Sequence, residues 1–164
     1  MPEIGLMSQI QEWGPHIWKI LHYHAEYAGS SSLLTDEIRA WTSLLKHTEG
    51  VLACPLCREH YKGWRTAHPV EEFLRRDKDT FRELLRKWLW DLHEYVNDQK
   101  DVPVEKRLPF EALSAYKELS RQEIGQSIST LKEVLQKSVL HRQVNPIYVT
   151  EWFRALKFLQ KLMF

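Results

Sequence analysis

The stretch Ala53-Cys54-Pro55-Leu56-Cys57-Arg58-Glu59-His60-Tyr61 holds both cysteines of the chain, three positions apart. Pro55 is suited to the first position of a helix, where its missing N–H removes no hydrogen bond. Cys54 then becomes the N-cap residue, and Cys57 lies in the first turn. Free N–H groups and the positive end of the helix dipole stabilise a thiolate at such a position. A C-x-x-C pair with a lowered pKa at a helix start is typical of a redox-active dithiol.

Other interpretations of the two cysteines stay open on this stretch alone. They could be two buried thiols, or half of a zinc site completed by His60 and His68, although C-x2-C-x2-H-x7-H is not a common finger spacing. A thioredoxin-like site needs strands around the motif, and the sequence predicts none. A cysteine protease built on Cys57 and His93 would lack a family signature around its cysteine. The sequence also has no glycine-rich nucleotide-binding motif.

The composition excludes several classes of function. The chain has 164 residues with 23 basic and 22 acidic side chains, so its net charge of +1 gives no footprint for nucleic acid or an anionic membrane. No apolar run reaches the ~20 residues of a membrane span, and residues 1–10 lack the features of a secretory signal. Two cysteines are too few for a secreted disulfide scaffold. We therefore expect an intracellular protein that binds neither nucleic acid nor membrane.

Hydrophobic periodicity predicts an all-α chain. The expected helices are Ile10 to Ala28, Thr35 to Glu49, Pro55 to about Ala67, Asp77 to Lys100 and a short Phe110 to about Leu119, followed by two apolar stripes, Ile124 to Val139 and Trp152 to Met163. The first four helices fit a bundle with short connections.

Local signals predict where some of these helices begin and end. Thr35 is expected to cap the second helix and Gly50 to end it, and Glu37 is expected to flank its buried stripe. Asp77 or Asp79 is expected to cap the fourth helix.

Two pairs of residues four positions apart share helix faces with aromatic neighbours. Trp18 and His22 form one pair, and His93 and Asn97 form the other, close to Trp90. Helix–helix packing is the alternative explanation for Trp18 and His22 taken alone. Aligned polar side chains beside so many aromatic residues favour the wall of a pocket for a flat aromatic ligand.

Taken together, three segments resemble the FAD-dependent sulfhydryl oxidases of the Erv/ALR type. Gly14-Pro15-His16-Ile17-Trp18, followed by His22 and Tyr27, is similar to the family's G-x-x-x-W-x-x-x-H segment. The dithiol stretch is similar to the C-P-x-C-R-x-H-[FY] form of members from large DNA viruses. Trp88 to Asn97 is similar to the W-x-x-x-x-H-N-x-V-N segment, and Pro109 to Tyr116 resembles the short fifth helix.

The resemblance implies a four-helix bundle with a short fifth helix that binds FAD noncovalently at its mouth. It assigns the catalytic dithiol to Cys54 and Cys57. In the implied reaction a substrate thiolate attacks Cys54 of the oxidised pair, and Cys57, next to the flavin, passes two electrons to FAD. Dioxygen reoxidises the flavin and hydrogen peroxide forms, so the net result is a disulfide bond in a dithiol-containing protein substrate. The cofactor contacts implied are Gly14, Trp18, His22, Trp90, His93, Asn97, Lys100 and Tyr116.

The chain departs from the family pattern at several positions. Glu94 stands where asparagine is usual, Val102 occupies the usual position of the lysine, and Tyr116 replaces an aromatic that is often tryptophan. The sequence has no third or fourth cysteine that could form a shuttle pair. We therefore expect that either the substrate protein or a separate redox carrier reaches Cys54 directly.

The chain is expected to have two parts. Residues 1–118 form the Erv/ALR-like sulfhydryl oxidase domain, and residues 119–164 form a helical C-terminal extension. The apolar stripes of the extension must be buried somewhere, and a self-association or partner surface is the leading hypothesis, with folding back onto the bundle as the alternative. We expect a homodimer and, for a viral protein, a location in the host cytoplasm and virion. The competing function is a non-enzymatic helical interaction module with a structural or zinc-binding CxxC.

Overall fold

The computed structural model describes residues 2–75 and 77–164, and the side chains of residues 12–72 and 77–164. Within these ranges the chain is helical and has no strand, which confirms the all-α prediction. The side chain of Ile10, where the first expected helix begins, lies outside the described parts. The elements are α1 Pro2–Glu26, α2 Leu34–Val51, α3 Pro55–Ala67, η1 Val70–Arg75, α4 Lys78–Gln99, η2 Val104–Lys106, η3 Phe110–Glu118, α5 Arg121–Leu140 and α6 Pro146–Met163.

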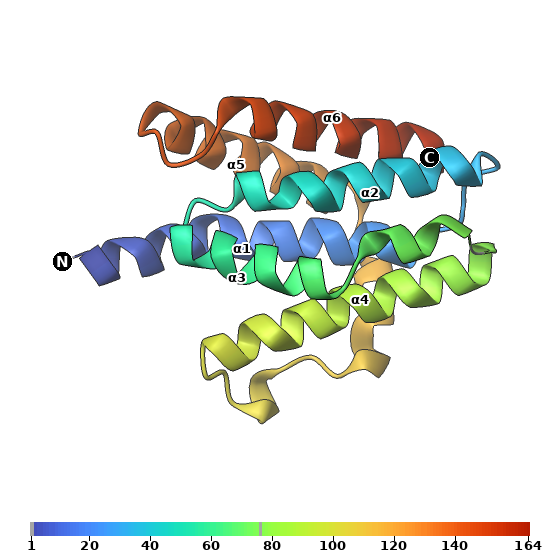
Figure 1. Cartoon of the computed structure of the whole chain (residues 1–164), viewed down its shortest axis with the longest axis horizontal. Coiled ribbons are helices and arrows are strands. Elements are labelled where there is room, and N and C mark those ends of the chain that lie inside the picture. Colours follow the sequence, from blue (N-terminus) through green and yellow to red (C-terminus); the bar gives the residue numbers. More distant parts are fainter. Residues whose placement is uncertain (1, 76) are drawn as a thin grey trace.

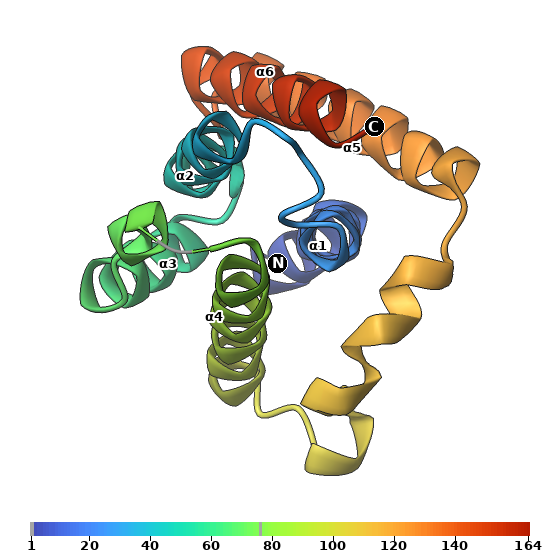
Figure 2. The same ribbon diagram turned by 90° about the vertical axis from the view of Figure 1, so that its right-hand side faces the viewer.

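Helices α1 to α4 form the bundle, and α5 and α6 form a layer on one side of it (Figure 1). Seen end-on, the two C-terminal helices cover α1 and α2 and lie away from α3 and α4 (Figure 2). The 3-10 segment η3 is the short fifth helix, and it packs against α1 and α4. Among the described helices, none combines the length and apolar character that crossing a membrane requires.

The central helix is α1, whose residues from Ile20 to Glu26 are all buried. Its polar side chains must therefore find partners inside the protein. The carboxylate of Glu26 accepts a hydrogen bond from Arg86 Nε of α4 at 2.8 Å. His24 Nδ1–H donates to the carbonyl oxygen of Ile20 at 2.6 Å, so Nε2 carries the lone pair that accepts from Gln160 of α6 at 3.1 Å. Burial lowers the pKa of His24 to about 4, which keeps this ring neutral near pH 7.

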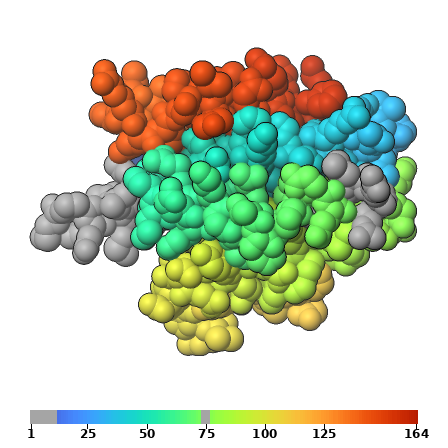
Figure 3. All heavy atoms as spheres, in the orientation of Figure 1, coloured from blue at the N-terminus to red at the C-terminus, as the bar shows by residue number. Residues whose placement is uncertain are grey.

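The two apolar stripes of the C-terminal segment are buried within the chain. The Ile124 stripe of α5 packs on α1, and the Trp152 stripe of α6 packs on α2. Trp152 is fully buried, and its Nε1–H donates to Thr48 Oγ1 of α2 at 3.0 Å. The expectation that these stripes form a self-association or partner surface is therefore wrong, because α1 and α2 themselves offer the apolar faces that the stripes cover. Figure 3 shows the atoms of the C-terminal segment lying directly against those of α2.

The predicted helix starts are correct where the capping side chain bonds a residue within the first turn of the helix. Asp77 caps α4, because its carboxylate accepts the Thr80 N–H at 2.9 Å. Thr35 does not cap α2, which already begins at Leu34 without a side-chain cap. The reason lies in the preceding loop, where the carboxylate of Glu37 accepts hydrogen bonds from the backbone N–H groups of Gly29, at 2.7 Å, and Ser31, at 3.2 Å. Glu37 is fully buried instead of flanking the stripe.

Gly50 does not end α2, which continues to Val51. Its role is to let α6 approach, because a Cβ atom placed there would lie 2.2 Å from Tyr148 Cβ and 2.5 Å from Tyr148 Cγ. A tyrosine Cβ is fixed by its backbone and cannot swing away, so only a residue without a side chain fits beside this turn of α6.

We predict that Gly50→Ala destabilises the protein by about 1–3 kcal/mol, because the first turn of α6 must shift. The second variant Tyr148→Gly removes the clashing atoms, so the double variant should lose less stability than the two single losses added. Gly125→Ala is the matched control, since a Cβ there meets nothing within 4 Å, and it should be neutral or slightly stabilising. Denaturant unfolding measures the free energy of unfolding of the four variants and of wild type, and equal stability of Gly50→Ala and Gly125→Ala would contradict the close approach.

Candidate functional site

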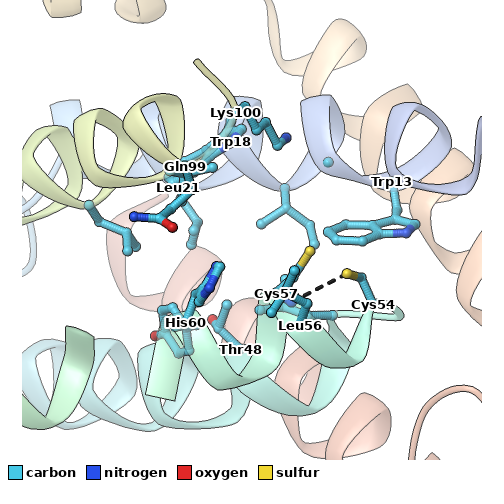
Figure 4. A pocket seen from close by; sticks show the side chains of 16 residues that line it. Trp13, Trp18, Leu21, Thr48, Cys54, Leu56, Cys57, His60, Gln99 and Lys100 are labelled. Atoms are coloured by element: carbon cyan, nitrogen blue, oxygen red, sulfur yellow. Dashed lines mark hydrogen bonds between the residues drawn. The ribbon is translucent and has the colours of Figure 1, made fainter. Parts of the chain in front are cut away.

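The four helices of the bundle enclose a cavity of about 220 Å³. It lies where α3 begins and α4 ends, and every helix of the bundle contributes to its wall (Figure 4). The wall is mostly apolar, with few polar groups. The lining residues are Trp13, Gly14, Ile17, Trp18, Leu21, Thr48, Leu52, Cys54, Leu56, Cys57, His60, Tyr61, Leu92, Val96, Gln99 and Lys100.

Both cysteines extend from the start of α3 into this cavity (Figure 4). Cys54 is the N-cap residue of α3 and Pro55 its first residue, as predicted. The backbone N–H of Cys57 donates to Cys54 Sγ at 3.3 Å, and both residues are free thiols. The adjacent sulfurs can therefore share a disulfide in the oxidised protein.

The two thiols differ in exposure and environment. Cys54 is 6% exposed, and Cys57 is only half-buried. A protein thiol therefore reaches Cys54 only when a neighbouring side chain moves. Leu56, which is 64% exposed and lines the same cavity, is the exposed side chain next to it.

The expected lowering of the thiol pKa is wrong for Cys57. Burial, together with the interaction with Cys54, raises the pKa of this thiol to about 12, while the positive charge of Lys100 acts in the opposite direction. The helix start does provide N–H groups, but the wall around the sulfur is apolar and disfavours the charged form. Cys57 is therefore held as a thiol in the reduced protein.

A layer of stacked rings lies beside the cavity and begins with Trp18 in its wall. The rings of Trp18 and His93 stack with centroids 3.9 Å apart and planes within 5°. The ring centroid of His22 lies 5.3 Å from that of His93 and 4.9 Å from that of Tyr116, and both pairs are stacked. The structure thus brings together four of the predicted cofactor residues, from α1, α4 and η3.

The two histidines of this layer share a hydrogen bond. His22 Nε2 and His93 Nδ1 lie 3.1 Å apart, so one nitrogen donates its proton and the other accepts it. Burial lowers the pKa of His22 to about 3 and that of His93 to about 4, with the positive charge of Lys100 adding to the effect on His93. Both rings are therefore neutral near pH 7 and offer hydrogen-bond groups without charge.

The remaining predicted cofactor residues lie in different places. Gly14 and Lys100 line the cavity, whereas Trp90 and Asn97 do not. Trp90 Nε1–H donates to the carbonyl oxygen of Leu108 at 3.0 Å and so holds the segment after α4. The backbone carbonyl oxygen of Asn97 accepts a hydrogen bond from the backbone N–H of Val102 at 3.0 Å. Cofactor contacts by these two side chains stay predictions.

Glu94, the departure from the family asparagine, has a partner outside the cavity. Its carboxylate accepts from Arg107 Nη1 at 3.3 Å, and the same nitrogen donates to Asp98 at 2.6 Å. The substitution therefore contributes to an ion-pair group that fixes the turn after α4.

Several wall residues were not singled out from the sequence. Trp13, Thr48 and Gln99 were absent from the expected site, and His60 was considered only as a zinc ligand or a packing residue. Trp13 belongs to the same apolar stripe as the core of α1, so its spacing alone cannot distinguish it from core. Across the described residues, no group of three His, Cys, Asp or Glu side chains lies close enough to hold a metal ion.

The wall residues fit the FAD that the resemblance implies. Trp13 Nε1 is buried and has no hydrogen-bond partner among the described residues, and a bound acceptor would satisfy it. Flat rings, neutral imidazoles and one cation at the rim suit a heteroaromatic cofactor that carries phosphates. The cavity of about 220 Å³ is smaller than the roughly 300–1,000 Å³ of typical ligand pockets, so a dinucleotide must extend beyond it.

A comparison with known families places this site inside a matched region. The family model described as the Erv1 / Alr family matches residues 15–111, which include both cysteines and most of the ring layer. No curated protein and no solved structure matches the chain.

We predict that Cys57 of the reduced, FAD-free protein is alkylated slowly at pH 8. A pKa near 12 instead of 9.0 leaves about a thousandfold less thiolate, which is the reactive form. The alkylation rate of Cys57 should keep rising as the pH increases through 10, because a raised pKa means that the thiol loses its proton only at higher pH. Iodoacetamide labelling followed by mass spectrometry of the Cys57 peptide measures it, and the chain unfolded in guanidinium is the control. A plateau near pH 9 in the folded protein would contradict the assignment.

Proposed function

The chain belongs to the Erv1/Alr family, which indicates FAD-linked sulfhydryl oxidase activity, and we propose that Cys54 and Cys57 carry this activity. One observation supports the proposal most directly. The only two cysteines of the sequence lie at the start of one helix and extend into an apolar cavity of the bundle, next to a layer of stacked aromatic and imidazole rings.

We propose that FAD is held by three residues of the cavity wall, Gly14, Trp18 and Lys100, together with the ring layer beside the cavity. Trp18, His93, His22 and Tyr116 offer ring faces and neutral hydrogen-bond groups, and Lys100 offers a cation. Gly14 provides a wall without a side chain. The chemistry that FAD supplies when bound is acceptance of two electrons from the reduced pair and their transfer to dioxygen, which gives hydrogen peroxide.

The protein residues carry the thiol chemistry. A substrate thiolate attacks Cys54 Sγ of the oxidised pair, the Cys54–Cys57 bond breaks, and Cys57 leaves as a thiolate. A second substrate thiolate then attacks the substrate sulfur of the mixed disulfide and releases Cys54, so the substrate leaves with a disulfide bond. The positive charge of Lys100 favours the thiolate of Cys57 against the cost of burial.

The finer features of the proposal concern partners and setting. Because the sequence has no third cysteine, a dithiol-containing protein substrate or a separate redox carrier must reach Cys54 directly. We also propose a homodimer, in keeping with the exposed ring of Phe158 on α6. The C-P-x-C-R-x-H-[FY] pattern supports a relation to the viral forms, and with it a location in the host cytoplasm and virion. Residues 1–118 and 119–164 are proposed as the oxidase domain and its extension.

The proposed activity has a direct test. Protein purified from a flavin-replete host should be yellow, with flavin absorbance, and should consume dioxygen when dithiothreitol is supplied. Cys57→Ser should stay yellow but lose turnover, because the two-electron relay needs both sulfurs. Ser129→Ala, an exposed change on α5, is the control that should keep both properties. Well-folded wild-type protein without FAD would favour a non-enzymatic helical module instead.

We predict that the two cysteines are unequal toward a partner. In Cys57→Ser, Cys54 remains as the thiol at the helix start and should form mixed disulfides with an activated partner protein. In Cys54→Ser, we expect bound FAD to cover Cys57, so little should be trapped from the FAD-loaded protein, although Cys57 is the more exposed thiol of the structure. Non-reducing electrophoresis compares the variants after incubation with thioredoxin whose reactive cysteine carries thionitrobenzoate as a mixed disulfide. The free thiol of the variant attacks that cysteine sulfur and displaces thionitrobenzoate. Preferential trapping through Cys57 would overturn the roles given to the two sulfurs.

A further inference from the structure

A second concavity lies on the outer side of α3, away from the dithiol cavity. It has a volume of about 640 Å³ and is bounded by the end of α2, the outer face of α3 and the turn between α5 and α6. We call it the α3 groove. The residues that decide its character are Glu49, Arg58, Glu59, Lys62 and Arg142.

Arg58 fixes this groove next to the redox pair. Its Nη1 donates to the carbonyl oxygen of Leu52 at 3.0 Å and to that of Gln143 at 2.8 Å. The first bond holds the segment that leads into Cys54, and the second holds the α5–α6 turn. In Figure 3 the turn and the start of α3 lie side by side on one face of the molecule.

The groove begins one helical turn after the dithiol. The backbone N–H of Arg58 donates to the carbonyl oxygen of Cys54 at 3.0 Å, and four residues advance about 6 Å along the helix axis. The exposed Leu56 lies between the two sites in the sequence. A polypeptide whose cysteine reaches Cys54 can therefore place its neighbouring residues in the groove.

The charge of the groove is positive. Of its two carboxylates, Glu49 is paired with Arg65 at 3.3 Å, which lies outside the lining. The exposed cations Lys62 and Arg142 have no ion-pair partner among the described residues. The hydrogen bonds of Arg58 Nη1 go to neutral carbonyl groups, so no carboxylate compensates its positive charge through them. Glu59 alone opposes these cations.

We propose that the α3 groove docks an acidic segment of the protein dithiol substrate, so that the C-terminal extension helps to select the substrate. The inference rests on the proposed oxidase function. Glutamate or aspartate side chains near the reactive cysteine would contact Lys62 and Arg142, while the cysteine meets Cys54. Small dithiols carry no such segment, so their oxidation does not depend on the groove.

The test compares two synthetic dithiol peptides that differ only in their flanking residues, glutamates in one and lysines in the other. Lys62→Glu and Arg142→Asn change the groove without touching the cavity, and asparagine tolerates the positive φ of 57° at position 142. Lys157→Glu, an exposed charge reversal on α6 outside the groove, is the matched control. Oxygen consumption gives kcat/KM for each peptide and for dithiothreitol. Fluorescence anisotropy of labelled peptides with serine in place of cysteine gives binding without any dependence on FAD.

Wild-type protein should bind and oxidise the glutamate peptide roughly tenfold better than the lysine peptide at low salt, and the preference should shrink as salt is added. Lys62→Glu and Arg142→Asn should lose that preference and keep their rate with dithiothreitol, while Lys157→Glu should keep both. Equal binding of the two peptides by wild-type protein, or loss of the preference in Lys157→Glu, would overturn the docking inference. Absence of dithiothreitol oxidation by FAD-loaded wild-type protein would instead refute the proposed function, and the anisotropy result would still decide whether the groove selects acidic peptides.

Discussion

The fold depends on the enclosure of the second half of α1, where residues 20–26 are all buried. This helix lies between η3, α4 and α5, and its second half has no face left for solvent. The polar side chains of that half, among them His22, His24 and Glu26, therefore need a partner from another element, and α4 and α6 provide them. A buried polar group without such a partner costs more than the hydrogen bond itself contributes. The positions of α4 and α6 are thus fixed by hydrogen bonds to buried side chains of α1 as well as by apolar contact.

The sequence predicted the features that depend on neighbouring residues alone. The cap at Asp77 and the Cys54–Pro55 helix start involve contacts within one turn, so local pattern is sufficient. Gly50 was misinterpreted because its reason lies in Tyr148, almost a hundred residues later. The stripes of α5 and α6 were recognised as apolar, but periodicity says nothing about which surface covers them. The role of Gly50 and the burial of the two stripes both depend on contacts between distant segments of the chain.

The same division applies to the candidate site. Family motifs identified Trp18 and His93, which the structure stacks together, but apolar periodicity could not separate Trp13 from ordinary core. The electrostatics of Cys57 show why a motif cannot give a pKa. A helix dipole contributes about 0.3–1 kcal/mol, less than one pKa unit, whereas burial in an apolar wall acts in the opposite direction and is larger here. Whether a C-x-x-C pair is reactive is therefore decided by what surrounds it.

The hydrogen bond between His24 and Gln160 joins residues 136 positions apart, and this has a consequence for how the protein is made. The chain leaves the ribosome from its N-terminus, so α1 emerges long before α6 exists. Until then the His24 ring and the apolar face of α2 lack the elements that cover them. The entropic cost of closing a loop grows only slowly with its length, so the long separation costs little stability. The late formation of the contact follows from the order of synthesis. The contact between α1 and α6 can therefore form only after α6 has been synthesised.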